Sequence, residues 1–329
     1  MGFQARKSFK VMPGVRMTVS KGGLSTSVGV KGARVTRGAS GRVTRSVGIP
    51  GSGVYHTKSL GSGTSRSRKP MPTATEPPKP GFTSPKWEKE LYKAVTEQLF
   101  DEFPRIASAH PEAGFIASAL EGLTSAAGGG RNDRALTVLQ WVWDHGGQIE
   151  DHPFAAKYLT PMFVKVGVAQ GVLAELPFSR DAVGLALVEL LQEAGNIKGA
   201  IQVAESLDPS QIAAVSLAEL YVESLRYDDV VDLTNGVQNN DDASALLMTY
   251  RGLALRELGH HTAAREALKE ALKSKAREAG IRHLALLERS RSYQAENRNA
   301  QARKDLERIF AEDSDFPGIR EALATSETD

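Results

Sequence analysis

Cysteine is absent from the 329 residues, and aromatic side chains make up only 6 % of them. The absence of cysteine excludes disulfide bonds and thiolate metal sites, and it fits a reducing compartment. No apolar run approaches the roughly 20 residues that a membrane-spanning helix needs. The basic N-terminus also lacks the apolar core of a signal peptide. We therefore expect a cytoplasmic protein.

Acidic residues are missing from the first part of the chain. Residues 1–75 contain 14 lysines and arginines and no aspartate or glutamate. The rest of the chain holds the other 27 basic residues against all 39 acidic ones, so the overall charge of +2 hides a body with a net charge of −12. This asymmetry predicts a basic module attached to an acidic body.

Motifs that carry catalytic chemistry are also lacking. The chain has no Gly-x-x-x-x-Gly-Lys-Ser/Thr loop and no recognisable order of nucleophile, base and acid. The pairs Asp144-His145 and Asp151-His152 match no metal-binding spacing, and His260-His261 falls in a predicted turn. We therefore predict no catalytic residue, no metal site and no cofactor, and we expect a protein that is not an enzyme.

The N-terminal segment consists of short runs in which apolar and polar residues alternate, and glycines separate the runs. Alternation with period two predicts strands, and the glycines suit tight hairpins between them. We expect a small antiparallel sheet in a basic β module over residues 1–57. Arginines recur on these runs, and together with two lysines between the runs they form the predicted polyanion-binding set. The expected strands are Val15–Val19, Leu24–Val28, Ala33–Arg37, Arg42–Val47 and Val54–His56, and the set is Arg16, Lys21, Lys31, Arg34, Arg37, Arg42 and Arg45.

Several short motifs of this module resemble those of a known family. They are the opening Met1-Gly-Phe3, the Pro13-Gly-Val-Arg16 turn, Ser20-Lys21 and the closing Gly48-Ile-Pro-Gly-Ser-Gly53. In this combination they resemble the bacterial domain-of-unknown-function family 4236, over about residues 1–57. The resemblance implies a recognisable small module and no activity.

Residues 58–85 consist mainly of Ser, Gly, Thr, Pro and Lys. So few apolar side chains cannot offset the entropy lost on ordering, which predicts a flexible linker. Residues 86–176 then change to helical periodicity. We expect a helix from Ser84-Pro85 to about Phe103 and others at about 111–126, 132–144 and 153–159. Residues 162–176 are compatible with strand or helix, and we predict a helix because the neighbouring segments are helical.

Residues 177–329 show an internal repeat, most clearly in Leu246–Lys273, which reads as two helices joined at Gly259-His260. If Ala200, Val230, Ala264 and Ala302 are equivalent, the repeats are 30, 34 and 38 residues apart. The mean of 34 is the tetratricopeptide period, and the pattern of small and large residues resembles that family. The second unit departs from it at Asp228, Asp229 and Val230. The residues predicted to pack the repeats are Gly195, Ala200, Gly252, Ala264, Leu268 and Ala302.

The sequence thus predicts an α+β multidomain chain: a small antiparallel β module, a flexible linker, a helical segment and an all-α tetratricopeptide-like solenoid. Whether residues 86–176 belong to the repeat stack stays open. We expect an interaction or adaptor protein whose repeats hold a protein or peptide partner. Its basic module would contact a polyanion, whether nucleic acid, an anionic membrane surface or an acidic protein. The alternative is a structural subunit of a homo-oligomer or filament formed through the β module.

Overall fold

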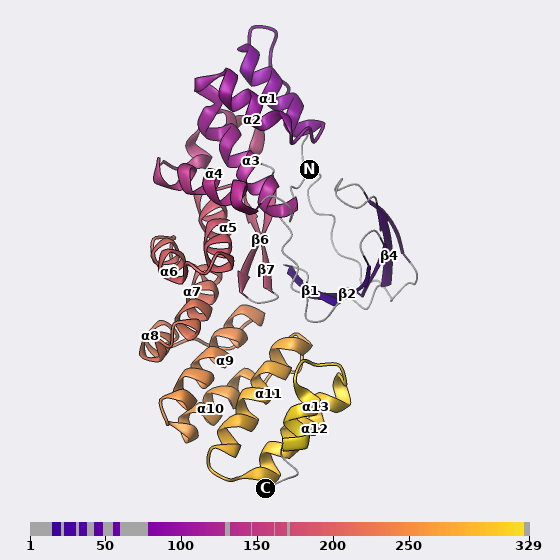
Figure 1. Ribbon diagram of the computed structural model, residues 1–329, viewed down its shortest axis with the longest axis vertical. Coiled ribbons are helices and arrows are strands. Elements are labelled where there is room, and N and C mark those ends of the chain that lie inside the picture. The colour runs from indigo at the N-terminus through magenta and orange to yellow at the C-terminus, as the bar shows by residue number, and fades with distance from the viewer. Residues whose placement is uncertain are drawn as a thin grey trace. The chain divides into compact units, whose positions relative to one another are not determined.

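The computed structural model describes residues 15–20, 23–30, 33–37, 43–48, 55–59, 78–128, 132–145, 147–160, 162–169 and 172–325. The chain divides into two compact units, Met1–Asp208 and Pro209–Asp329. Figure 1 shows the strands of the N-terminal part in indigo and the helices from magenta to yellow. Among the helices that the structure describes, none combines the length and apolarity needed to cross a bilayer.

The N-terminal part forms one antiparallel sheet in which each strand pairs with the next along the chain, in the order β1-β2-β3-β4-β5. Strands β1 and β5 are therefore its two edges. Register pairs Arg45 with both Val35 and Lys58. The strands are β1 Val15–Ser20, β2 Gly23–Val30, β3 Ala33–Arg37, β4 Val43–Gly48 and β5 Tyr55–Ser59.

The first helix is shorter than its sequence predicts. α1 spans Lys86–Thr96 and α2 spans Glu102–Ala109, so the prediction of one helix to Phe103 is wrong. Gln98 has a φ of 59°, and the amide of Leu99 bonds back to the carbonyl of Ala94. A left-handed residue with such a bond ends a helix, because it reverses the chain and satisfies the last carbonyls.

The next helices agree with the predicted ranges. After the short turn η1 Pro111–Ala113 come α3 Gly114–Gly128 and α4 Asn132–Asp144. The turns η2 Ile149–Asp151 and η3 Ala155–Leu159 follow, the latter with π-type hydrogen bonding. Phe154 and Tyr158 pack against each other with ring centroids 5.0 Å apart, and Trp87 and Tyr92 of α1 pack against them. Aromatic contacts therefore fix α1 to the segment before the next element.

That next element is a β-hairpin, so the prediction of a helix over residues 162–176 and of an entirely α-helical body is wrong. β6 Phe163–Ala169 pairs antiparallel with β7 Val172–Pro177. Val164, Val166 and Val168 alternate along β6 and are all buried. β-branched side chains at period two favour a strand, because they fill a sheet face without the χ1 restriction that a helix imposes. In Figure 1 the hairpin lies beside α5, with which β6 is in contact.

The first unit ends with a helical hairpin, α5 Arg180–Glu193 and α6 Ile197–Glu205. Ser179 and Asn196 cap the two helices by accepting hydrogen bonds from the amides of Ala182 and Gly199. A Cβ on Gly184 of α5 would lie 2.5 Å from Leu207, so the helix can approach the end of the hairpin closely only with glycine there.

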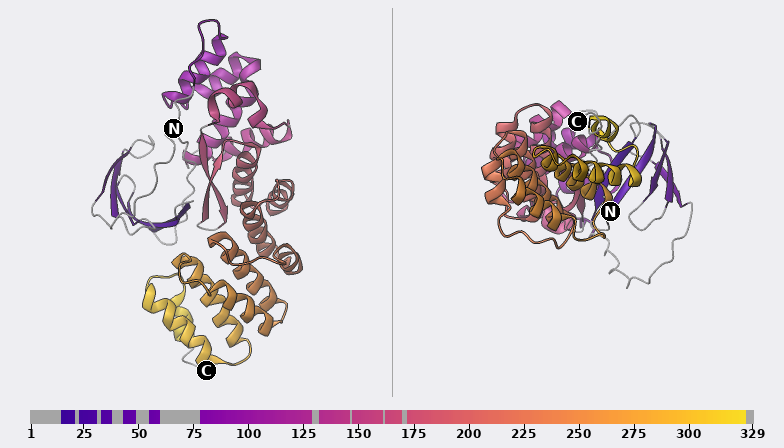
Figure 2. Two further views of the ribbon diagram at one scale, coloured as in Figure 1. Left: turned by 180° about the vertical axis from the view of Figure 1, so that it is seen from behind. Right: turned by 90° about the horizontal axis from the view of Figure 1, so that it is seen from below.

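The second unit contains three more helical hairpins and a final short helix. α7, α9 and α11 lie next to one another, while α8 packs on α7 and α9, α10 on α9 and α11, and α12 on α11. The hairpins follow one another toward the yellow end of the chain in the left view of Figure 2. Their helices are α7 Gln211–Glu223, α8 Tyr227–Leu233, α9 Asp242–Glu257, α10 His261–Ala271, α11 Ala279–Gln294, α12 Asn299–Glu312 and α13 Ile319–Thr325.

All four hairpins turn in the same way. The turns contain Gly195, Leu225, Gly259 and Asn297, with φ values of 75°, 58°, 81° and 57°. Each of these left-handed residues lies five positions before one of the small or β-branched residues that the repeat spacing makes equivalent. Those residues, Ala200, Val230, Ala264 and Ala302, are all completely buried.

Candidate partner-binding surface

The close approach of α9 and α10 depends on two of the predicted packing residues. A Cβ on Gly252 would lie 2.4 Å from Cγ of Leu268, which is itself completely buried. Ala264 is also completely buried on α10, whereas its neighbour Ala263 is exposed. Small residues let the two helix backbones approach, and a large side chain fills the remaining space.

The other predicted packing residues lie in the corresponding hairpins. Ala200 and Ala302 are buried on α6 and α12. Gly195 has no neighbouring atom within 4 Å of an added Cβ, so its left-handed turn, rather than close packing, explains the glycine. These residues hold each hairpin together and leave recognition to other side chains.

A buried carboxylate joins neighbouring first helices of the second unit. Glu288 of α11 has a side chain only 1 % exposed, and Arg256 of α9 donates to its Oε2 at 2.9 Å. Arg291 donates to its Oε1 at 2.5 Å. Both oxygens of a desolvated carboxylate are thus satisfied, which such a group requires. The contact fixes α9 beside α11.

A second buried ion pair joins α11 to α12. Arg289 donates two parallel hydrogen bonds to Asp305, from Nε to Oδ2 at 2.8 Å and from Nη2 to Oδ1 at 2.6 Å. Burial alone would lower the pKa of Arg289, but the Asp305 carboxylate outweighs it and the pKa lies above its ordinary value. Such bidentate geometry fixes orientation as well as charge.

The contact between α7 and α9 is more apolar. Tyr250 of α9 is buried, and burial, followed by the nearby carboxylate of Glu219 on α7, raises the pKa of its phenol well above the usual range. Arg251 also reaches from α9 to α8, donating to the carbonyl of Val231 at 2.6 Å and to Oγ1 of Thr234 at 3.2 Å. The helices of the α7, α9 and α11 layer are thus tied to each other and to the second helices.

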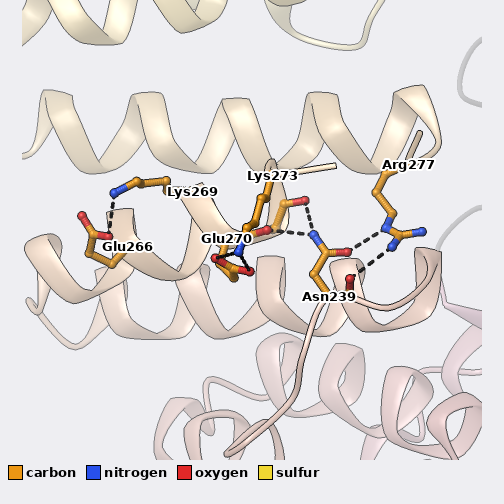
Figure 3. Close-up of polar contacts among 7 residues, drawn as sticks. Asn239, Glu266, Lys269, Glu270, Lys273 and Arg277 are labelled. Atoms are coloured by element: carbon orange, nitrogen blue, oxygen red, sulfur yellow. Dashed lines mark hydrogen bonds and ion pairs between the residues drawn. The ribbon is translucent and has the colours of Figure 1, made fainter. Parts of the chain in front are cut away.

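The loops between hairpins are also fastened together (Figure 3). The amide of Asn239 donates to the carbonyls of Glu270 and Ala271 at the end of α10, at 2.7 and 3.0 Å. Arg277 donates to Oδ1 and to the backbone carbonyl of Asn239, at 2.7 and 3.2 Å. We call this set the loop clamp. It satisfies carbonyls that a helix C-terminus leaves unpaired.

The face formed by α10 and the residues just after it, beside the loop clamp, carries two charge pairs. Glu266 accepts from Lys269 at 3.2 Å, and Glu270 accepts from Lys273 at 3.1 Å (Figure 3). Exposed pairs of this kind contribute little to stability. They make this face electrically neutral.

Histidines form no metal site in the part of the chain that the structure describes, where no group of three His, Asp or Glu side chains could hold an ion. His145 stacks on Trp141 at 4.3 Å, and His152 contacts the ring of Trp87. His260 is exposed in its turn. His283 is buried on α11, with Nε2 3.2 Å from Oε2 of Glu312.

The predicted polyanion-binding residues are divided between strands and turns. Arg16 lies in β1, Arg34 and Arg37 in β3, and Arg45 in β4. Register places Arg16 and Arg34 in one set of alternating positions of the sheet and Arg37 and Arg45 in the other. Lys21, Lys31 and Arg42 lie outside the described residues.

Sequence reasoning missed the charged side chains that join the hairpins. Arg256 and Glu288 are 32 positions apart, and Asn239 and Arg277 are 38 apart. No local motif connects residues so distant. The repeat register is the one available signal, because it places α9 beside α11 and so brings Arg256 and Glu288 to neighbouring helices.

Comparison with known proteins places this geometry in a family. Residues 125–327 match the family model described as T7SS, ESX-1 secretion system protein EccA1, N-terminal domain, which spans more than half of the chain. The chain belongs to the EccA1 N-terminal domain family. The matched region begins within α3, so it includes the β6–β7 hairpin as well as the four helical hairpins. Residues 3–57 match the model of a protein of unknown function, DUF4236.

Two solved structures are similar to this chain. The crystal structure of the N-terminal domain of the EccA1 ATPase from the ESX-1 secretion system of Mycobacterium tuberculosis has a TM-score of 0.55 and 16 % identity. The match covers 73 % of this chain and 88 % of that one. A tetratricopeptide-repeat protein of Thermus thermophilus, TTC0263, has a TM-score of 0.41 and 16 % identity over 65 % and 98 % of the two chains. No curated protein matches.

Membership of the EccA1 N-terminal domain family confirms tetratricopeptide-like helical repeats in the C-terminal part. The match of residues 3–57 to the DUF4236 model confirms the predicted N-terminal module. The side chains described above do structural work: they pair charges between helices and close loops.

Proposed function

We propose that this protein is a non-enzymatic interaction protein with two recognition surfaces. The layer formed by α7, α9 and α11 holds a protein or peptide partner. The basic β module contacts a polyanion. The named member of the family belongs to a secretion system.

The observation that supports the first surface is the internal pairing of the layer's charges. Arg256 and Arg291 are both bound to Glu288, and Arg289 is bound to Asp305. A rigid layer with satisfied charges loses little conformational entropy when a partner binds, which favours affinity. Stacked helical pairs generally use such extended surfaces for binding.

The test of this surface compares two lysine substitutions. Leu253 lies half-buried on α9, next to the closely packed Gly252, and Ala263 is exposed on α10. Leu253→Lys and Ala263→Lys add the same charge to different layers. Proteins from the native cell that bind the wild type should be lost with the first variant and kept with the second, once circular dichroism shows that both are folded. Equal recovery with both variants would place the partner elsewhere.

The polyanion surface rests on the 14 basic and no acidic residues among residues 1–75. Binding through charge releases counterions, so the affinity of the whole protein for duplex DNA, RNA or anionic vesicles should fall steeply between about 50 and 200 mM salt. Arg34→Gln with Arg45→Gln should weaken it, and Lys269→Gln with Lys273→Gln, which removes the same charge from α10 and the residues just after it, should not. An absence of binding at the lower salt would exclude the proposed binding of a polyanion by the β module.

The second candidate function is a structural subunit of a homo-oligomer or filament. It is favoured by the two edge strands of the N-terminal sheet, β1 and β5, because edge strands are ready templates for pairing with another chain. Light scattering at low and high salt separates the two functions. A mass that grows with protein concentration at both salt levels supports assembly, and a constant monomer mass excludes it.

A further inference from the structure

One position recurs on the first helix of every hairpin. Glu189, Glu219, Leu253 and Arg291 each lie six residues before the left-handed residue of their own turn. Because the turns are equivalent, these residues occupy equivalent positions of α5, α7, α9 and α11. What packs against this position in one hairpin therefore indicates what the same position can hold in the others.

In the first unit this position lies against a strand. Glu189 of α5 covers Gly167 of β6 so closely that a Cβ on the glycine would overlap the carboxylate. A strand glycine of this kind marks a close approach of the backbone to its neighbour. The first helix of a hairpin thus holds an extended backbone at this position.

In the second unit the charge changes from one first helix to the next, with α9 between α7 and α11. α7 contains two acidic residues and no basic one, α9 contains two of each, and α11 contains one acidic and three basic residues. The equivalent positions follow the same order, because Glu219 is acidic, Leu253 apolar and Arg291 basic. Glu219 and Leu253 are half-buried, and Arg291 keeps half of its side chain exposed although it donates to Glu288. The layer therefore changes from negative through neutral to positive.

We propose that this layer binds an extended peptide with a basic residue over α7, an apolar residue over α9 and an acidic residue over α11. This inference rests on the proposed function of the layer and specifies the chemistry of its partner. Complementary charge sets the order of the three residues. Packed helices lie roughly 8–10 Å apart, and every third residue of a polyproline-type extended chain points the same way at intervals of about 9 Å. The three residues of the peptide therefore follow one another at about every third position.

The test measures the affinity of the whole protein for three synthetic peptides with blocked ends, at low salt, where charge contacts are least screened. All three have a central leucine, and a charged residue lies three positions away on each side. The mixed peptide has lysine on one side and glutamate on the other, the second has lysine on both sides, and the third has glutamate on both. The mixed peptide should bind the wild type most tightly, because each of the others brings like charges together. Leu253→Lys should abolish this binding.

Reversing one charge of the layer should change which peptide binds best. Glu219→Arg should favour the peptide with two glutamates, and Arg291→Glu the peptide with two lysines, each by roughly threefold or more. Glu266→Arg, which makes the same change at an exposed position of α10, should leave the order of affinities unchanged. A damaged fold weakens all three peptides alike and does not exchange their order. Since Arg291 also donates to the buried Glu288, Glu219→Arg decides the test by itself if the other variant is unfolded.

Three results overturn the proposal: no binding of the mixed peptide, equal affinities for all three peptides, or an order of affinities that Glu219→Arg leaves unchanged. Tightest binding of the peptide with two lysines to the wild type also overturns it, and would indicate a uniformly basic partner. Each of these results leaves the proposed function standing, because the recovery of cell proteins by Leu253→Lys and Ala263→Lys tests that function separately.

Discussion

Leu225 is a residue in a conformation that suits glycine. Its φ of 58° falls in the left-handed region, where a β-carbon costs roughly 1–2 kcal/mol, and Gly195 and Gly259 occupy the equivalent turns of two other hairpins. Leu225→Gly should therefore raise the free energy of unfolding by about 1 kcal/mol, less the extra freedom that glycine has in the unfolded chain. Urea denaturation measures the difference.

The matched control for Leu225 is Leu258, which ends α9 with an ordinary φ of −75°. Leu258→Gly removes apolar contacts and relieves no strain, so it should lower the free energy of unfolding. If both substitutions shift the urea midpoint in the same direction, the strain at Leu225 is not the controlling effect.

Ala264 and Ala263 form a second matched pair at the residue scale. Ala264 is completely buried where α10 meets α9, and Ala263 is exposed. Ala264→Arg should overpack this contact and bury an unpaired charge, with a loss of several kcal/mol. Ala263→Arg should change stability by no more than about 0.5 kcal/mol. Thermal unfolding of the two variants checks the direction of each effect, and equal midpoints would contradict the observed helix phase.

The elements differ in how well the sequence predicts them. The α9–α10 hairpin was predictable because Gly259 breaks a strong helical period and small residues recur at repeat spacing. Strand β6 was not, because a short apolar run such as Phe163–Ala169 fits a strand or a buried helix equally, and its neighbours are helical. The end of α1 was also missed, because Gln98 adopts a conformation that the sequence usually marks with Gly or Asn.

Charged contacts between elements were the least predictable part of the candidate surface. The sequence around Glu288 does not distinguish it from an exposed helical glutamate, and its burial follows only from the position of α9 beside α11. The same holds for Asp305, which is buried only because Arg289 faces it. Pairing across elements depends on tertiary geometry, and one sequence carries no signal for it beyond the repeat register.

The contact between α11 and α12 should make stability depend on pH through His283. Burial lowers the pKa of His283 below its ordinary value of 6.5, although the carboxylate of Glu312 opposes this. Arg282, Arg308 and Asp313 are the other charged groups near the pair. His283 therefore binds a proton more readily in the unfolded chain than in the folded one. Its neutral form favours the folded state fully above pH 6.5, and this contribution to the free energy of unfolding is lost as the pH falls through the lower pKa of His283 in the folded protein.

His283→Gln isolates this effect. The free energy of unfolding of the wild type should decrease as the pH is lowered below 6.5, and the variant should lose that part of the decrease. Glu312 itself has a pKa below 4.5, so its own titration falls at lower pH. Urea titrations of both proteins at several pH values give the difference, and parallel curves would exclude His283 as the cause.

The composition of the whole chain predicts where it is cut first. Residues 58–85 are rich in Ser, Gly and Pro, whereas the segment from Arg180 to Ala311 consists of packed helical hairpins. Brief trypsin treatment should therefore cleave first after Arg66 or Arg68 and release the helical body intact. Mass spectrometry of the early fragments locates the cuts. First cuts within the hairpins would mean that the assumed division of the chain is wrong.

The loop clamp affects how the second unit unfolds. In a simple repeat array each hairpin contacts only its neighbours, and the end hairpins fray independently. Asn239 joins the connection after one hairpin to the last turn of the next, and through Arg277 to the connection after that. Breaking any one hairpin therefore exposes polar groups in two others. The amide protons of α8 to α11 should accordingly exchange with solvent as one cooperative group, while those of α13, beyond the clamp, exchange earlier.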